Sequence, residues 1–405
     1  MTVRPRRDVW ITGVCLVSSV GDGPQAHWAR LNNPGAPLLV EQGRAGWLVH
    51  PLPAMDFSAQ IPSRLDLKRM GLSQALGAYA AGRALDAAAL KGSAEILSKT
   101  VVVVSGAGGE RDIPLDESIF AEPARFADQA ALNEMLSTRT RPSFFLTQLP
   151  NLLAGNISIL FGITGGSRTT MGDELAGVSA YKIGCQLVDD GSYDVALVGG
   201  AFDVQRPDLV MLYGFGEYAW RHAHQPVALR SQQGGGFMLG AMAAFLVLES
   251  ADHARARGAS PWCRVGGIST HHTRRQKGDV ASALEQAFEE LELSRTAGPA
   301  GIISGATGVS PSTEEEMAAL SALASRRAGA RIRTSGTLFG HGMEASFPFN
   351  VGIAALALKQ GRLYPAWPGD PSDGSGADAL DRVLVTGVGH WRGEAVALLS
   401  SAATQ

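Results

Sequence analysis

The sequence predicts a layered α/β fold, in which buried strands alternate with helices that have one apolar face. Short apolar runs without alternation are typical of strands that are covered on both faces. Four such runs lie close to glycines: Val101–Val104, Val195–Val198, Ile302–Ile303 and Val383–Val385. Hydrophobic residues make up 45% of the 405 positions and charged residues 18%, so the chain can bury a large core.

The first element is expected to be a strand over Val9–Val17. This run follows a basic patch at Arg4–Arg7, and a basic patch before an apolar stretch also occurs in secretory signals. However, the run is rich in β-branched residues and is interrupted by Gly13, which suits a buried strand better than a helical apolar segment. We therefore interpret it as the first strand of a sheet.

Helices are expected where apolar residues recur at a spacing of three and four. Their apolar faces consist of Leu72, Leu76 and Tyr79 in one helix, Leu284, Phe288 and Leu291 in a second, and Met317, Leu320 and Leu323 in a third. Ser312 and Glu315 stand at the spacing of a capping box and predict the start of the third helix. Irregular structure is expected over residues 41–60, 110–143 and 365–377, where proline, glycine and charge displace the periodicity.

The chain also repeats itself weakly. Val104–Ala107 recurs as Ile303–Ala306, and Asp194–Gly199 is echoed by Asp381–Thr386. Matches this short also arise by chance between strands that end in glycine. Duplication of a unit and coincidence therefore both remain open as explanations of these matches. If the chain is duplicated, the seam is expected in the polar stretch near residues 253–260.

Composition excludes several classes of function. Lys and Arg number 35 against 38 Asp and Glu, a formal net charge of −3, so the basic surface of a nucleic-acid-binding protein is not expected. No apolar stretch reaches the roughly 20 residues that a membrane span needs. Cys15, Cys185 and Cys263 are too few and too scattered for a disulfide framework or a metal site, and they favour a protein of the reducing cytoplasm.

Several segments follow one another in a characteristic order: Val9–Val14, Pro150–Ile159, Asp194–Ala201, Gly236–Gly240, Leu246–Glu249 and Gly340–His341. In this order and spacing they resemble the β-ketoacyl-acyl-carrier-protein synthases, the condensing enzymes of the thiolase fold. The resemblance runs nearly from end to end. It implies two similar halves in a five-layered αβαβα body: an N-terminal half over 1–252, which contains the dimerisation and elbow segments, and a C-terminal half over 253–405.

The chemistry of that family implies four groups in the active site: a cysteine, two histidines and a lysine. A cysteine thiol becomes a useful nucleophile only when a helix N-terminus or a neighbouring cation favours its anion. The imidazoles donate hydrogen bonds to the thioester oxygen on which negative charge develops as carbon dioxide leaves. The resemblance therefore makes these four positions the candidate site.

Three of the four groups are absent from the matching positions. The resemblance places Glu174, in the elbow segment 171–178, where the nucleophilic cysteine belongs, and Gly305 where the first histidine belongs. Gly336 stands at the lysine position, whereas His341 retains the second histidine. Because a glutamate cannot form an acyl thioester, we expect the site of this chain to be inactive in condensation.

The glycine-rich gate of the family is matched by residues 387–392. Val388, Trp391 and Arg392 stand there as bulky or charged side chains in place of small ones. No cysteine replaces the missing nucleophile, because Cys185 lies about three helical turns beyond the elbow. We expect all three cysteines to be buried, inert thiols.

Two interpretations of Glu174 remain open. A carboxylate at a helix N-terminus is favoured by the helix dipole, in which case Glu174 is structural. Alternatively, Glu174 forms an internal ion pair with Arg392 or with His341 and plugs the emptied site. His341 is likewise either a residue of the site or a structural histidine held by hydrogen bonds.

Two classes of function follow, and we favour the first. In the first, the chain resembles a chain-length factor: a non-catalytic subunit that pairs with an intact synthase, works with acyl carrier protein, and sets product length through an acyl tunnel at the interface. The pathways would be fatty acid synthesis, including very long chains, or aryl polyene or polyketide synthesis. In the second, the chain is itself an acyltransferase or a malonyl-acyl-carrier-protein decarboxylase that uses Glu174 and His341. No metal and no cofactor are expected in either case.

Overall fold

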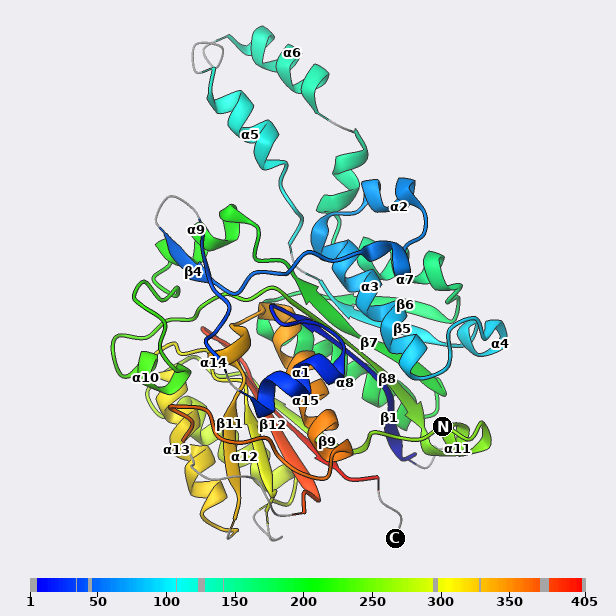
Figure 1. Cartoon of the computed structure of the whole chain (residues 1–405), viewed down its shortest axis with the longest axis vertical. Helices are drawn as coiled ribbons and strands as arrows, with labels where there is room; N and C mark the ends of the chain where they lie inside the picture. The colour runs from blue at the N-terminus through cyan, green and yellow to red at the C-terminus, as the bar shows by residue number, and fades with distance from the viewer. Residues whose placement is uncertain are drawn as a thin grey trace.

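Strands from both halves of the chain join in one large mixed sheet (Figure 1). The computed structural model describes residues 6–33, 35–42, 46–106, 108–122, 128–140, 142–293, 298–327, 329–371 and 379–402. The strands of this sheet are β1 (Val9–Ser18), β2 (Gly21–Asp22), β5 (Val101–Ser105), β6 (Gly166–Thr170), β7 (Val195–Phe202), β8 (Met242–Ser250), β9 (Cys263–His271), β10 (Gly301–Ser304), β11 (Arg331–Thr334), β12 (Arg382–Val388) and β13 (Glu394–Ser400). A separate hairpin pairs β3 (Val40–Gln42) with β4 (Trp47–Val49).

The strand order shows the same pattern on either side of its centre. It runs β11-β10-β12-β13-β9-β1-β8-β7-β5-β6. β5 is parallel to β6 and β7, as β10 is to β11 and β12, while β8 and β13 are antiparallel to both of their neighbours. The two sets of strands meet where Trp10 and Ile11 of β1 pair with Arg264 and Cys263 of β9. This repetition favours duplication over coincidence as the origin of the sequence echoes.

Helices cover both faces of the sheet and fill the space between its halves. The longer helices are α1 (Pro24–Asn32), α3 (Leu72–Ala87), α5 (Ile113–Phe120), α6 (Gln129–Arg139), α7 (Leu152–Phe161), α8 (Glu174–Asp189), α9 (Pro207–Phe215), α12 (Asp279–Glu290), α13 (Ser312–Ala324) and α15 (Ser346–Lys359). The shorter elements are α2 (Arg64–Arg69), α4 (Ala94–Leu97), α10 (Val227–Ser231), α11 (Ala251–Ala256) and α14 (Gly336–Phe339), with 3-10 turns η1 (Phe57–Ala59), η3 (Pro142–Gln148) and η4 (Met343–Ala345).

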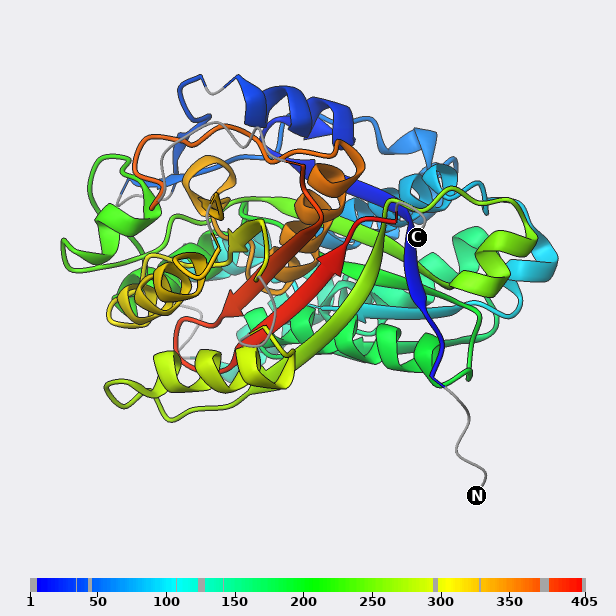
Figure 2. The same ribbon diagram turned by 90° about the horizontal axis from the view of Figure 1, so that it is seen from below.

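The layers follow from which helices touch which strands. α8 and α15 contact each other and lie between strands of the two halves, since each touches both β8 and β12 (Figure 2). α3 and α7 cover the outer face of the N-terminal strands, and α12 and α13 cover that of the C-terminal strands. The predicted five-layered αβαβα body is therefore confirmed.

The predicted strands are present. Val9–Val17 lies in β1, and the four apolar runs lie in β5, β7, β10 and β12. The boundary placed between residues 252 and 253 falls within α11, between β8 and β9, and it stays a prediction. Within the described ranges, every helix falls short of the length and apolar character that a membrane crossing requires.

The expectation of irregular structure over residues 110–143 was wrong, because α5 and α6 lie there. The carboxylates of Asp112 and Asp128 accept hydrogen bonds from backbone N–H groups in the first turns of these helices. Both helices project away from the body of the protein (Figure 1). They therefore lack the continuous apolar face by which a packed helix is recognised in a sequence.

The capping box expected at Ser312 and Glu315 was also wrong. α13 begins at Ser312, but no side chain caps it. The Glu315 carboxylate instead accepts hydrogen bonds from the backbone N–H groups of Gly278 (2.7 Å) and Val280 (3.0 Å), at the start of α12. Because an anion stabilises the positive end of a helix, this contact joins the two outer helices of the C-terminal half.

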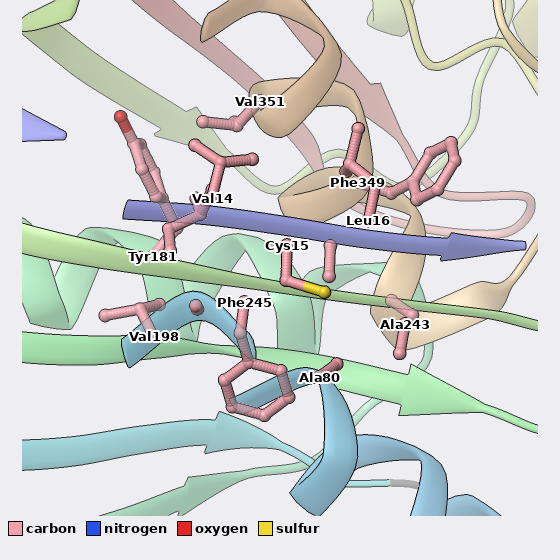
Figure 3. Packing of buried hydrophobic residues seen from close by; sticks show 14 of the residues in the cluster. Val14, Cys15, Leu16, Ala80, Tyr181, Val198, Ala243, Phe245, Phe349 and Val351 are labelled. Atoms are coloured by element: carbon pink, nitrogen blue, oxygen red, sulfur yellow. The ribbon is translucent and has the colours of Figure 1, made fainter. Parts of the chain in front are cut away.

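The core is built around β1, whose two faces are both buried (Figure 3). Val14 and Leu16 point from β1 towards Phe349 and Val351 of α15, and Cys15 points to the opposite face (Figure 3). This alternation is expected for a strand that is covered on both sides. All three cysteines are free and buried, as predicted.

Glycines allow α8 to pack closely against its neighbours. A Cβ at Gly184 would lie 2.3 Å from Cγ2 of Val198 in β7. A Cβ at Gly177 would lie 2.3 Å from the carbonyl oxygen of Glu344. Only glycine permits these close approaches. They fix the position of α8 and therefore also the position of Glu174 in its first turn.

Candidate functional site

α8 begins at a sharp turn that follows β6, the last strand on that side of the sheet among the described residues. Gly172 has a φ of 126° and Asp173 a φ of 52°, a region that L side chains rarely adopt, so the backbone at Asp173 is strained. Two hydrogen bonds hold Asp173: the Tyr213 hydroxyl donates to Oδ1 (3.3 Å) and the Trp391 indole N–H donates to Oδ2 (3.0 Å). The turn directs the next side chain, that of Glu174, into the protein.

The carboxylate of Glu174 is buried between two imidazoles. His341 Nε2 lies 2.9 Å from Glu174 Oε1, and His390 Nδ1 lies 2.9 and 3.1 Å from the two carboxylate oxygens. The backbone N–H of His390 is a third donor, at 3.2 Å. The structure thus brings Glu174 to His341, as one interpretation of the sequence expected, and to His390, which the sequence analysis missed.

Glu174 carries a negative charge at neutral pH. Burial raises its pKa, but the attraction of His390 and the hydrogen bonds from both histidines outweigh burial and hold the pKa well below its usual range. An ionised carboxylate only accepts hydrogen bonds, so the imidazole N–H groups donate to it. The other side of His341 is fixed as well, because its Nδ1 lies 3.3 Å from Ser346 Oγ.

Aromatic rings surround the His390 imidazole. The ring centroids of Tyr218, Phe237 and Tyr213 lie 4.6, 5.6 and 5.7 Å from that of His390, each in an edge-on arrangement. Phe237 also lies 5.4 Å from His341. These rings keep water away from the carboxylate–imidazole contacts, which makes the contacts electrostatically stronger.

The predicted gate segment forms the turn between β12 and β13. Val388 is the buried last residue of β12, and Trp391 and Arg392 are exposed in the turn. No ion pair joins Arg392 to Glu174 in the described part of the chain; the Arg392 guanidinium lies over the Trp391 ring, 4.1 Å from its centroid. The neighbouring His390 makes the contact that was considered for Arg392. The role of this segment as a gate stays a prediction.

Arg275 anchors the turn from the other side. Its guanidinium donates to the carbonyl oxygens of Gly389 (2.6 Å) and Gly393 (3.2 Å) and forms an ion pair with Glu394. The sequence analysis missed this residue, because it stands in a polar stretch at residues 271–277 that is typical of a surface loop. Its role depends on where the C-terminal turn lies in space, which no local pattern encodes.

Gly305, Gly336 and His341 line one small internal cavity. Its volume of about 10 Å³ is roughly the space of a single water molecule. A Cβ at Gly305 would lie 2.4 Å from the Thr386 carbonyl oxygen, so no histidine fits there unless the backbone moves. The structure therefore brings Gly305, Gly336 and His341 to one cavity and Glu174 to His341, and this cavity is too small for an acyl chain.

Two further carboxyl groups are buried close to this cavity. Glu316 accepts hydrogen bonds from the hydroxyls of Ser304 and Thr386, and burial raises the pKa of Glu316 to about 7. Burial raises the pKa of Glu344 to about 8. Both acids therefore hold their protons to a higher pH than Glu174 does.

The site thus offers one fixed anion, two imidazoles and no thiolate. Cys185 lies further along α8, and burial raises the pKa of its thiol to about 12, so it does not replace the missing nucleophile. In the described ranges, no three His, Cys, Asp or Glu side chains come together in a way that would hold a metal ion. The arrangement suits a fixed hydrogen-bond network around an anion better than a nucleophile.

Comparison with known proteins gives the same family as the sequence resemblance. The family described as "Beta-ketoacyl synthase, N-terminal domain" matches residues 43–254. The 3-oxoacyl-[acyl-carrier-protein] synthase 2 of Vibrio harveyi is 25% identical over 77% of this chain and 78% of that protein. The corresponding protein of Vibrio cholerae serotype O1 is 24% identical over 93% of this chain and 92% of its own length.

Known structures share the fold. The ishigamide ketosynthase/chain length factor has a TM-score of 0.80 at 20% identity, covering 98% of this chain and 99% of the other. A type II polyketide acyl-carrier protein in complex with its ketosynthase has a TM-score of 0.78 at 16% identity, covering 98% of this chain and 100% of the other. At such identities the likeness shows the fold alone.

Replacing Glu174 by glutamine is expected to destabilise the protein, and most strongly near neutral pH. The pKa of Glu174 is lower in the folded protein than its ordinary value of 4.5, so its charge contributes stability above about pH 4.5 that is lost as the pH falls towards the folded pKa. Breaking a buried, charged contact of this kind costs about 3 kcal/mol. Denaturant unfolding of both proteins between pH 3 and 8 measures the difference, which should shrink on acidification.

The exposed Glu95 on α4 provides a matched control. Glu95→Gln is expected to change the free energy of unfolding by less than about 0.5 kcal/mol at every pH. A Glu174→Gln effect that is equally small, or that does not depend on pH, would contradict the assignment of Glu174 as a buried anion.

Proposed function

The chain belongs to the β-ketoacyl synthase family, and from that premise we propose that it is a non-catalytic subunit of a condensing heterodimer. In this proposal an intact synthase carries the cysteine, acyl carrier protein delivers the substrate, and this chain sets the length of the product. The pathways that fit are fatty acid synthesis, including very long chains, and aryl polyene or polyketide synthesis.

One observation carries the proposal: the carboxylate of Glu174, at the position that the resemblance assigns to the nucleophile, is buried and held by hydrogen bonds from His341 and His390. All three hydrogen-bond donors around Glu174 are fixed in the protein interior, and the adjoining cavity of about 10 Å³ is too small for an acyl chain. Loss of one member of a cooperating catalytic set usually lowers the rate by orders of magnitude. Here the thiol is absent and glycines stand at two of the remaining positions.

The N-terminal half offers a surface on which a partner fits. β6 is the last strand of the sheet on that side in the described part of the chain, so its outer backbone groups are free to pair. Apolar side chains are exposed beside it: Ile159 on α7 is 83% exposed, and Met171, directly after β6, is 60% exposed. A second chain that pairs with β6 would bury both side chains.

The arm formed by α5 and α6 extends the same half away from the body (Figure 1). Phe120, at the end of α5, and Phe145, in η3, are both exposed. Phe120 lies on the projecting arm itself, and an exposed large apolar side chain on such an element suits an interaction surface. A partner seated against this arm gives the proposed heterodimer a large interface.

The comparisons support this choice of partners. One protein of the same fold is described as a ketosynthase/chain length factor, and another as an acyl-carrier protein in complex with its ketosynthase. A tunnel shared by two subunits gives a non-catalytic subunit a function. The tunnel buries the methylene groups of the growing acyl chain until a protein side chain blocks further growth.

Co-expression with a synthase that retains its cysteine, chosen from neighbouring genes, is expected to give a stable heterodimer. Met171→Trp fills space at the expected interface and should shorten the main product by roughly one or two two-carbon units, since each methylene that loses burial costs about 0.8 kcal/mol. Light scattering after size-exclusion chromatography measures the complex, and mass spectrometry measures the product length.

Leu229→Trp is the matched control, because Leu229 is a partly exposed residue on α10, outside the surface formed by β6 and α7. It should leave both the heterodimer and the product unchanged. The proposal fails if this chain associates with no such synthase, or if a heterodimer forms and its product length is the same with Met171→Trp.

A second candidate function is an enzyme that uses Glu174 and His341 for decarboxylation or acyl transfer. The observation that favours it is the hydrogen bond between a buried carboxylate and an imidazole, a pair that moves protons in general acid–base catalysis. Under our proposal, the purified single chain does not turn over malonyl- or acyl-acyl carrier protein, which a carbon dioxide release assay and mass spectrometry measure. Turnover that is abolished by Glu174→Ala and retained by Glu95→Ala would establish the enzyme instead.

A further inference from the structure

The turn between β12 and β13, residues 389–393, has a flexible composition. Glycines stand at both of its ends, and Gly393 has a φ of 82°, which other residues rarely adopt. The N–H of Gly389 donates to the carbonyl oxygen of Gly393 at 3.0 Å and closes the turn. One hydrogen bond between two glycines stabilises a turn only weakly, so further contacts are needed to hold this turn in place.

Arg275 joins both ends of the turn. Its Nη2 donates to the carbonyl oxygens of Gly389 (2.6 Å) and Gly393 (3.2 Å). Its Nη1 forms an ion pair with Glu394, the first residue of β13. The hydroxyl of Thr273 donates to Glu394 Oε1 (2.7 Å) and accepts from Arg275 Nη1 (3.0 Å). A planar guanidinium makes several such contacts at once, which suits it to bridge the two ends.

The position of Arg275 is itself unfavourable in two respects. Its φ is 61°, in the left-handed region, so its backbone is strained. Its side chain is only 15% exposed, and the buried Nε has no hydrogen-bond partner among the described residues. Strain and an unpaired buried donor persist only where the remaining contacts outweigh them. The contacts of Arg275 with the turn and with Glu394 are those contacts.

On its other side the turn lies against the first turn of α8. A Cβ at Gly393 would lie 2.2 Å from Cδ1 of Leu175, the second residue of α8. The turn is therefore held from two directions, by Arg275 and by α8. Between its two ends it carries His390, whose backbone N–H and Nδ1 both contact the Glu174 carboxylate.

We propose that Arg275 is a positioning residue, which holds the turn of residues 389–393 closed over α8 and thereby keeps His390 on the Glu174 carboxylate. Arg275 acts through the carbonyl groups before and after His390. Opening the turn would leave the guanidinium short of acceptors and the buried Glu174 carboxylate short of donors, and both losses are costly. The segment that the resemblance assigns to a gate therefore stays closed in this chain.

This inference does not rest on the proposed function. It concerns how the turn is held, and it applies whether the chain is a non-catalytic subunit or an enzyme.

Hydrogen exchange of the full chain, measured by mass spectrometry, tests the role of Arg275. In Arg275→Met, the backbone N–H groups of residues 388–394 are expected to exchange at least about tenfold faster, because the turn opens locally. Peptides from β5 should exchange as they do in the unmodified protein. Arg274→Met removes an exposed arginine from the same loop, so it is the matched control and should leave all rates unchanged.

A second readout separates positioning from a general effect on stability. An imidazole N–H that donates to a buried carboxylate exchanges slowly with water and gives its own proton signal in NMR spectra. The variants His390→Gln and His341→Gln assign the two signals at Glu174. In Arg275→Met the His390 signal should be lost, whereas the His341 signal should stay, because the contact of His341 with Glu174 does not involve the turn.

Arg275→Lys replaces Arg275→Met if the latter does not fold. Lysine retains the charge but lacks the planar group, so residues 388–394 should again exchange faster. Unchanged exchange in these residues, or a retained His390 signal, in a folded Arg275 variant would overturn the proposal. Equal acceleration in β5 and in the turn would overturn it as well, because Arg275 would then stabilise the whole fold instead of positioning the turn.

Discussion

The contact of the Glu174 carboxylate with two imidazoles fixes the arrangement of the rest of the site. A buried anion is tolerable only where donors and positive groups meet it, and here they come from two distant segments: His341 after α14 and His390 in the turn between β12 and β13. The contact therefore joins the first turn of α8 to the C-terminal half. The hydrogen bond from Trp391 to Asp173 reinforces the same junction one residue earlier.

Among the described residues, the interior next to this junction has no space for a ligand, whereas the surface of the N-terminal half is open to contact with another protein. Gly305 and Gly336 face a cavity of about 10 Å³, and the Gly305 backbone is too close to Thr386 for a larger side chain. By contrast, β6 is the last strand on its side of the sheet among the described residues, Met171 beside it is exposed, and α5 and α6 project from the body. In the proposed role, the fold contributes through its interface, where a partner's acyl chain grows, and its own site is filled by the hydrogen-bonded Glu174 carboxylate and two imidazoles.

The sequence predicted those parts of the structure that local pattern or family spacing encodes. The apolar runs became strands, and the ordered segments of the resemblance located Glu174, Gly305, Gly336 and His341, which the structure brings together. His390 was not recognised, because its contact with Glu174 exists only once the C-terminal turn lies over α8. For the same reason, nothing in the sequence distinguished the carboxylate of Glu315, which caps a neighbouring helix, from one that caps its own.

The central claim is that this chain carries no acyl group and shapes the product of a partner that does. Intact-protein mass spectrometry of the heterodimer after exposure to acyl-acyl carrier protein tests it most directly, because each subunit is weighed separately. The account predicts that the partner synthase gains the mass of one acyl group on its cysteine and that this chain gains none. A covalent acyl group on this chain, at Glu174 or at any other residue, would contradict the account.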